Sequence, residues 1–198
     1  MKRFINVRGF TLTELLLVMA VLAVISAMAI PSILNMSAQI RFSANVRQVE
    51  RELQNARMKA VKSNRAIRVR FNCPSATKYR TVELLGSVQS PAADDADSRA
   101  SARCGYSSYP YPDPDPEFFA IPNNDGPIQI LQTGVGFGSD VQTIEFWPDG
   151  SAHYESGGGN PWPVIPNEGI GLTVFDIMRP STIVTSISVN GLGKIAIN

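Results

Sequence analysis

The chain has 198 residues, of which 18 are basic and 17 acidic, and its formal net charge is +1. This length allows one modest hydrophobic core behind an N-terminal helix, and the single histidine excludes a histidine-rich metal site. The near-neutral charge hides a division, because residues 41–70 hold nine basic and two acidic residues whereas residues 71–198 hold six basic and fourteen acidic ones. We expect a positive stem that carries a negative head, and a solvated helix face is enough to explain the stem.

The N-terminal region is a short basic leader that ends at Gly9, followed by a long apolar stretch. Residues 10–30 are apolar apart from a few positions, which are Thr11, Thr13, Glu14 and Ser26. A helix of this length is about 30 Å long, enough to cross the hydrocarbon core of a bilayer. An acidic residue inside such a helix costs on the order of 3 kcal/mol, so Glu14 indicates a function.

Two ordinary interpretations compete for this region. The basic start, the apolar residues 15–25 and the sequence Ala27-Met28-Ala29 fit a secretory signal peptide cleaved near Ala29. The position of Glu14 at the start of the apolar stretch and Pro31 just beyond the cleavage point count against it. A plain membrane anchor explains neither Glu14 nor the glycine before Phe10.

Gly9 followed by Phe-Thr-Leu-Thr-Glu resembles the type III signal sequence of type IV pilins and pseudopilins, and the match continues to Pro31. The resemblance implies that a prepilin peptidase cuts between Gly9 and Phe10 and methylates the new terminal amine of Phe10. It implies that Glu14 is the glutamate at the fifth position of the mature chain. It also implies a single-pass protein of the bacterial inner membrane with its C-terminal head in the periplasm.

The resemblance gives Glu14 a physical role. Phe10 and Glu14 are four residues apart and so share one face of a helix. Cleavage would create an ammonium at Phe10 with a reference pKa of roughly 8, which stays charged at neutral pH. The Glu14 carboxylate of one subunit can neutralise the amine of its neighbour in the membrane. We therefore expect Glu14 to set subunit register during assembly.

The stem that follows shows the spacing of an amphipathic helix. Apolar residues recur every three or four positions at Phe42, Val46, Val49, Leu53, Ala56 and Ala60, and no glycine or proline interrupts residues 32–64. This stripe is expected to pack on a sheet. Pro31 removes one helical hydrogen bond and predicts a kink at the join. Residues 55–62, with Arg57 inside them, resemble the ARxxA end of the helix in the GspH/FimT branch of the pilin family.

Beyond Asn64 the pattern becomes that of short strands separated by turns. Strands are expected at residues 67–71, 79–85, 128–131, 143–147, 151–154, 172–178, 183–189 and 193–197, with a Pro-Asp-Gly turn at residues 148–150. The segment 134–138 lacks the dinucleotide-binding spacing and is expected to be a loop. The Phe-x-Pro-x-Gly hairpin and the strand after Gly193 are GspH/FimT-like.

These elements predict the α+β pilin fold, in which one long N-terminal helix packs on an antiparallel β-sheet head. The lower half of the helix is transmembrane and the upper half amphipathic. The predicted divisions are a leader at residues 1–9, a membrane and assembly helix at 10–31, an amphipathic stem at 32–64 and a periplasmic head at 65–198.

Cys73 and Cys104 are the only cysteines. In a head exported to an oxidising periplasm we expect them to form a disulfide, which would close a loop of about 30 residues and contribute roughly 3–4 kcal/mol. Two free thiols is the alternative. No metal site or cofactor is expected, because Asp94, Asp95 and Asp97 lack the spacing of a calcium-binding loop. His153 completes no recognisable Ser-His-Asp set, so we do not expect an enzyme.

The sequence thus predicts a minor pilin or pseudopilin that helps prime and cap a type IV pilus, incorporated at its tip. Its partners would be other pilin subunits, the prepilin peptidase and the inner-membrane assembly platform. Alternatives are an H-type minor pseudopilin of a type II secretion system, a DNA-binding competence pilin and a secreted periplasmic binding domain with a conventional signal peptide. Lys194 is the candidate DNA contact, but residues 193–196 lack the Gly-Arg-x-Arg motif of some FimT-like proteins, and the acidic head opposes nucleic acid.

Overall fold

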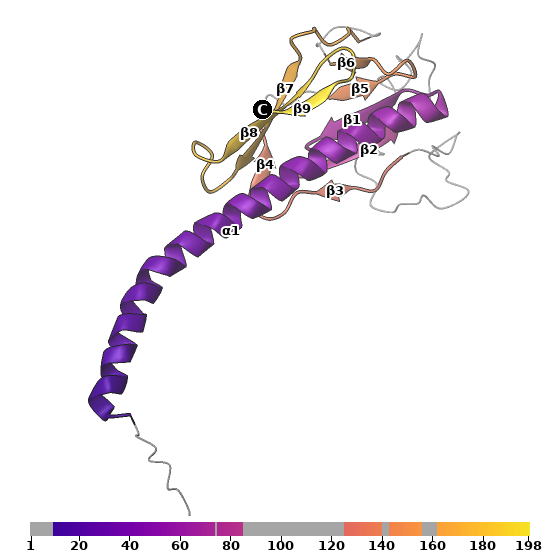
Figure 1. The fold of residues 1–198 in the computed structure, drawn as a ribbon. Helices are drawn as coiled ribbons and strands as arrows, with labels where there is room; N and C mark the ends of the chain where they lie inside the picture. The colour runs from indigo at the N-terminus through magenta and orange to yellow at the C-terminus, as the bar shows by residue number, and fades with distance from the viewer. Residues whose placement is uncertain (1–9, 74, 85–124, 140–142, 156–161) are drawn as a thin grey trace, which may run out of the picture. The chain divides into compact units, whose positions relative to one another are not determined.

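The computed structural model describes residues 10–73, 75–84, 125–139, 143–155 and 162–198, with the backbone alone at Pro31 (Figure 1). Within these ranges one helix precedes nine strands. Their bounds are α1 (Leu12–Ser63), β1 (Ile67–Phe71), β2 (Lys78–Glu83), β3 (Gln129–Ile130), β4 (Val135–Phe137), β5 (Ile144–Phe146), β6 (Ala152–Tyr154), β7 (Ile170–Asp176), β8 (Val184–Val189) and β9 (Ile195–Ile197). The chain divides into two compact units between residues 40 and 41.

The first unit contains the N-terminal part of α1. Thr11 caps the helix, because its Oγ1 accepts a hydrogen bond from the Glu14 backbone N–H at 3.2 Å and its carbonyl accepts one from Leu15 at 3.1 Å. The helix is long and apolar enough to span a membrane, with a mean hydropathy of 2.5 over its most apolar 18 residues. Helical backbone continues through Pro31, and the kink expected there stays a prediction.

In the second unit the amphipathic stem behaves as its spacing predicts. All six residues of the apolar stripe are buried, and Val49, Leu53, Ala56 and Ala60 have no exposed surface. They belong to one hydrophobic core with side chains from most strands, such as Ile67, Ile144 and Val189. The helix ends at Ser63, and Asn64 takes the left-handed conformation with a φ of 52° that commonly terminates helices.

The strands form two antiparallel sheets rather than one. The first sheet has the order β3-β2-β1-β5-β6 and the second the order β4-β7-β8-β9. Residues 67–71 of β1 pair with 79–83 of β2, and residues 67–69 also pair with 144–146 of β5. In the second sheet β7 pairs with β8 over residues 170–175, and β9 adds a short edge. The expected antiparallel head on one long helix is confirmed.

The expectation that residues 134–138 form a loop is wrong. Residues 135–137 form β4, which pairs with residues 174–176 of β7. A Cβ at Gly136 would lie 3.4 Å from the Ile177 side chain, which is ordinary van der Waals contact. The glycines that suggested a loop are therefore compatible with a short strand at a sheet edge.

Candidate functional site

The N-terminal part of α1 presents an uncovered apolar surface. Every side chain described between residues 10 and 37 is exposed, and none of the most apolar 18-residue window is buried. Phe10 is 79% exposed, and Glu14 lies in the first helical turn, where the helix dipole favours a negative charge. Gly9 lies outside the described residues, so the cleavage site stays a prediction. The surface has the composition to be covered by lipid or by neighbouring helices.

The sequence features at residues 55–62, 146–150 and 193 meet in space at Arg57. Its Nε donates a hydrogen bond to the Gly150 carbonyl at 3.1 Å, and its Nη2 donates one to the Leu192 carbonyl at 3.0 Å. Gly150 belongs to the turn between β5 and β6, and Leu192 to the turn between β8 and β9. One helix side chain thus joins the stem to both sheets.

Gly193 shows how closely these parts approach one another. Its φ is +70°, a conformation that favours glycine. A Cβ at this position would lie 2.4 Å from the Gly150 carbonyl oxygen and 2.5 Å from Arg57 Nε. The glycine is therefore needed where the two turns and the arginine converge. Sequence reasoning singled out all three segments but did not predict that they touch.

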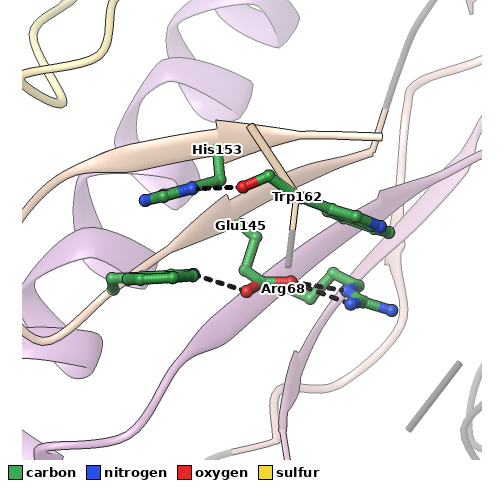
Figure 2. Close-up of polar contacts among 5 residues, drawn as sticks. Arg68, Glu145, His153 and Trp162 are labelled. Atoms are coloured by element: carbon green, nitrogen blue, oxygen red, sulfur yellow. Dashed lines mark hydrogen bonds and ion pairs between the residues drawn. The ribbon is translucent and has the colours of Figure 1, made fainter. Parts of the chain in front are cut away.

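The first sheet carries a buried polar cluster that the sequence did not reveal. Arg68 on β1 and Glu145 on β5 are each 1% exposed, and Arg68 Nη2 donates to Glu145 Oε2 at 2.8 Å (Figure 2). The other carboxylate oxygen of Glu145 accepts a hydrogen bond from Trp147 Nε1 at 2.6 Å. Both charges of the pair therefore have partners, as burial requires.

Three further contacts close this cluster into a ring. The Trp147 ring stacks on His153 of β6 with a centroid distance of 3.8 Å and an interplanar angle of 11°. His153 Nδ1 lies 2.8 Å from the Trp162 carbonyl oxygen, and the Trp162 ring lies 3.8 Å from Arg68 Cζ. We call Arg68, Glu145, Trp147, His153 and Trp162 the polar–aromatic ring. It fastens the segment after residue 161 onto the first sheet.

Asp149, Ser151 and His153 lie together without forming a catalytic triad. Asp149 Oδ1 contacts Ser151 Oγ at 2.6 Å, and Ser151 Oγ contacts His153 Nε2 at 3.0 Å. The serine stands between the acid and the histidine, so the carboxylate does not orient the imidazole as it does in a hydrolase. Among the described residues no cluster of three His, Cys, Asp or Glu side chains is placed to hold a metal.

The remaining candidate residues are dispersed. Lys194 is exposed and its backbone N–H donates to Asn190 Oδ1 at 2.9 Å. Cys73 is 3% exposed and is not a free thiol. Cys104 lies outside the described residues, as do Asp94, Asp95 and Asp97, so the Cys73–Cys104 pairing and the calcium alternative stay untested.

Comparison with known proteins gives one family match and one similar fold. The family of the prokaryotic N-terminal methylation motif matches residues 5–30. The structure of the minor pseudopilin EpsH from the Type 2 Secretion System of Vibrio cholerae aligns with a TM-score of 0.43 and 9% identity, covering 79% of this chain and 94% of that chain. No curated protein matches the chain in sequence. The methylation motif, the apolar helix that contains most of it and the antiparallel head behind the stem make the chain similar to type IV pilins and pseudopilins.

Proposed function

We propose that the chain is a minor pilin that enters the bacterial inner membrane through residues 10–31, carries its head in the periplasm and helps prime and cap a type IV pilus. The observation that carries this proposal is the exposed apolar surface of α1, much of which belongs to the methylation motif. Such a surface is stable only in lipid or against other apolar helices.

Processing would complete this surface. Removal of residues 1–9 leaves Phe10 as an N-methylated cation next to the first turn of α1, where Thr11 caps the helix. Glu14 is exposed on that turn, so its carboxylate is available to the terminal amine of a neighbouring subunit. An ion pair between subunits removes the cost of leaving each charge alone in lipid.

The stem and head are the parts of the subunit that a plain membrane anchor lacks. Its helix stripe is fully used in its own core, so lateral contacts of the stem must be made by its charged faces. Exposed arginines such as Arg41, Arg47 and Arg51 suit attraction to the acidic head of an adjacent subunit. This role is structural and needs no bound cofactor.

Deletion of the gene tests the proposal directly, with sheared surface pili and secreted exoproteins measured in the same cultures. Loss of pili with normal secretion supports a minor pilin. Normal pili with lost secretion would instead assign the chain to a type II secretion system. Intact pili and intact secretion together would contradict a priming role.

Complementation with point variants tests the assembly mechanism. Glu14→Ala is expected to leave the protein inserted and cleaved but poorly incorporated, because the neighbour's amine loses its partner. Thr13→Ala, which alters the adjacent residue and keeps the carboxylate, is the matched control. Incorporation of Glu14→Ala at the wild-type level would remove the proposed ion pair from the mechanism.

A further inference from the structure

The end of the head at which the chain enters from the apolar helix can be identified from its contacts. Arg41 is the first residue of the second unit, and Asn45, one helical turn later, accepts a hydrogen bond at its Oδ1 from the Gln132 N–H at 2.8 Å. In the same turn before β4, the Gly134 carbonyl accepts a hydrogen bond from the Ile177 N–H at 2.7 Å. The turn before β4 and the turn between β7 and β8 therefore both lie at this end, here called the entry end.

The opposite end of the head is marked by Arg57. This residue bonds to Gly150 in the turn between β5 and β6 and to Leu192 in the turn between β8 and β9. Arg57 lies about 18 Å beyond Asn45 along the helix, at 1.5 Å for each residue. The turns at the two ends of the head are thus well separated, and the turn between β7 and β8 belongs to the end that follows the apolar helix.

The turn between β7 and β8 exposes apolar side chains at the entry end. Met178 is 84% exposed, the largest value among the large apolar residues that the structure describes, and Ile177 is 48% exposed. Val184, at the start of β8, is 50% exposed. We call residues 177–180 the tip. Contact with an apolar surface would remove these side chains from water and would therefore stabilise the tip.

Backbone N–H groups of the tip are satisfied within the chain. Ile177 donates to the turn before β4, as described above. The N–H groups of Met178 and Arg179 donate to Asp176 Oδ1 at 2.9 and 3.0 Å. Pro180 has no N–H to satisfy. Moving such a turn out of water costs little, because these donors keep their partners, and this is the condition that lipid imposes on a backbone.

Two arginines at the entry end suit contact with phospholipid headgroups. Arg41 is exposed, and the side chain of Arg179 is 35% exposed with its Nη2 4.0 Å from Asp176 Oδ2. A guanidinium beside apolar side chains can extend to the level of the headgroup phosphates while its hydrocarbon stem stays against lipid. The entry end therefore combines apolar and basic side chains, as interfacial membrane contacts do.

The length of the uncharged helix places the entry end close to the membrane surface. Residues 15–40 carry no charged side chain and make about 39 Å of helix. A hydrocarbon core is about 30 Å thick, and a bilayer with its headgroups about 40–45 Å. With Glu14 at one face of the bilayer, Arg41 falls in the headgroup layer of the other face. This step rests on the proposed function, because it requires the apolar helix to span the bilayer.

We propose that the tip is a second membrane contact, which inserts Ile177 and Met178 into the interface of the bilayer that α1 crosses. Arg179 and Arg41 remain at the level of the headgroup phosphates. Lipid is the occupant that these observations favour, because every inserted subunit has a membrane at its entry end before it meets a neighbour. With the helix and the tip both held, the head cannot rotate freely about α1 before assembly.

The experiment measures the depth of the tip with a polarity-sensitive fluorophore on the variant Met178→Cys of the full chain. The chain is reconstituted in vesicles of phosphatidylethanolamine and phosphatidylglycerol, with brominated lipids as quenchers at known depths. Leu192→Cys is the matched control, because Leu192 is an apolar residue, 73% exposed, at the opposite end of the head. Leu22→Cys reports whether α1 is in the bilayer. The unmodified chain, taken through the same labelling, gives the background.

We expect the probe at residue 178 to emit at shorter wavelength than the probe at 192 and to be quenched by bromine near the headgroups. The probe at 22 should be quenched by bromine at the centre of the bilayer. Adding Ile177→Asp to the Met178→Cys chain should reduce quenching by about twofold or more, because a charge is costly near hydrocarbon. This second substitution shows whether the tip, rather than the fluorophore, enters the lipid.

Three results would overturn the membrane contact of the tip. Equal quenching at 178 and 192, with the probe at 22 quenched, would reject the contact and leave the membrane helix intact. A probe at 178 that emits at shorter wavelength only at high ratios of protein to lipid would show that a neighbouring protein covers the tip. Absence of quenching at 22 would reject the membrane helix itself, and the contact of the tip with it.

Discussion

Replacing Arg57 by alanine tests whether one side chain joins the stem to both sheets. Arg57 donates to the Gly150 carbonyl at 3.1 Å and to the Leu192 carbonyl at 3.0 Å. Hydrogen bonds from a charged donor contribute about 1.5–3 kcal/mol each when buried. Arg57 is only half-buried and Leu192 is exposed, so hydrogen bonds to water can replace part of this contribution in the variant. We expect Arg57→Ala to lower the free energy of unfolding of the head by about 2 kcal/mol.

The assay is urea unfolding of the full chain in detergent, followed by tryptophan emission. For a domain of this size a loss of about 2 kcal/mol corresponds to a melting temperature lower by roughly 4–8 °C. Arg51→Ala is the matched control, because Arg51 is exposed and its Nε bonds to the Arg47 carbonyl of its own helix at 3.2 Å. Arg57→Lys keeps the charge but cannot reach both carbonyls with a planar fork, so it should be destabilised nearly as much.

A double-mutant cycle makes the test specific to the three-way contact. Gly193→Ala should destabilise by itself, since its Cβ would meet both Gly150 and Arg57. In the Arg57→Ala background part of that clash disappears, so the two losses should be less than additive by about 0.5 kcal/mol or more. Equal stability of Arg57→Ala and Arg51→Ala, or full additivity in the cycle, would refute the role assigned to Arg57.

Five further outcomes are expected. Glu145→Gln should cost about 3–5 kcal/mol in urea unfolding, because it removes the carboxylate charge that faces the buried Arg68, and a loss below about 1 kcal/mol would contradict this. The hydroxyl of Tyr79 is buried and has no hydrogen bond of good geometry among the described residues, although Gln48 lies near enough to affect its pKa, so Tyr79→Phe should be neutral or stabilising. Burial, followed by the Glu52 charge, raises the pKa of Tyr79. The tyrosine of the unfolded chain therefore ionises first, and the wild-type chain should lose stability above about pH 10. Tyr79→Phe should lose less stability over the same range. The intact mass of the protein from cells should show loss of residues 1–9 and one added methyl group, whereas cleavage near residue 29 would indicate a secreted domain. Gel shifts at low salt should show little DNA binding, and clear binding that weakens in Lys194→Ala would restore the competence alternative.

The long helix and most strands could be predicted because their patterns are local. Six apolar residues at helical spacing fix the buried face of the stem, and alternation around Ile67 and Val69 fixes β1. The strand at residues 135–137 was missed because its glycines suggest a turn, and its pairing with β7 is not contained in the local pattern. The division into two sheets depends on pairings between distant segments, which no local pattern contains.

The polar–aromatic ring was missed for a different reason. Arg68 and Glu145 alternate with apolar neighbours in their strands, so the pattern places them on a face expected to be wet. Burial of that face depends on segments such as residues 162–165, which come from elsewhere in the sequence. The ion pair also requires the correct strand register, in which Arg68 on β1 lies directly opposite Glu145 on β5. Opposite charges on two strands could have predicted the pair, but only if the sequence had shown that β1 and β5 are neighbours in the sheet.

The bond between Arg57 and the Leu192 carbonyl spans 135 residues, and this separation has a consequence for how the head forms. The helix is made first, yet its apolar stripe has no complete partner until the last strands have been synthesised. At typical synthesis rates of 5–20 residues per second the stripe waits roughly 7–27 s. During that time it is exposed to aggregation, since contacts so far apart in sequence form late and slowly. A chaperone that covers amphipathic helices would therefore raise the yield of folded protein, and a truncation after β7 should leave the stem without a complete core.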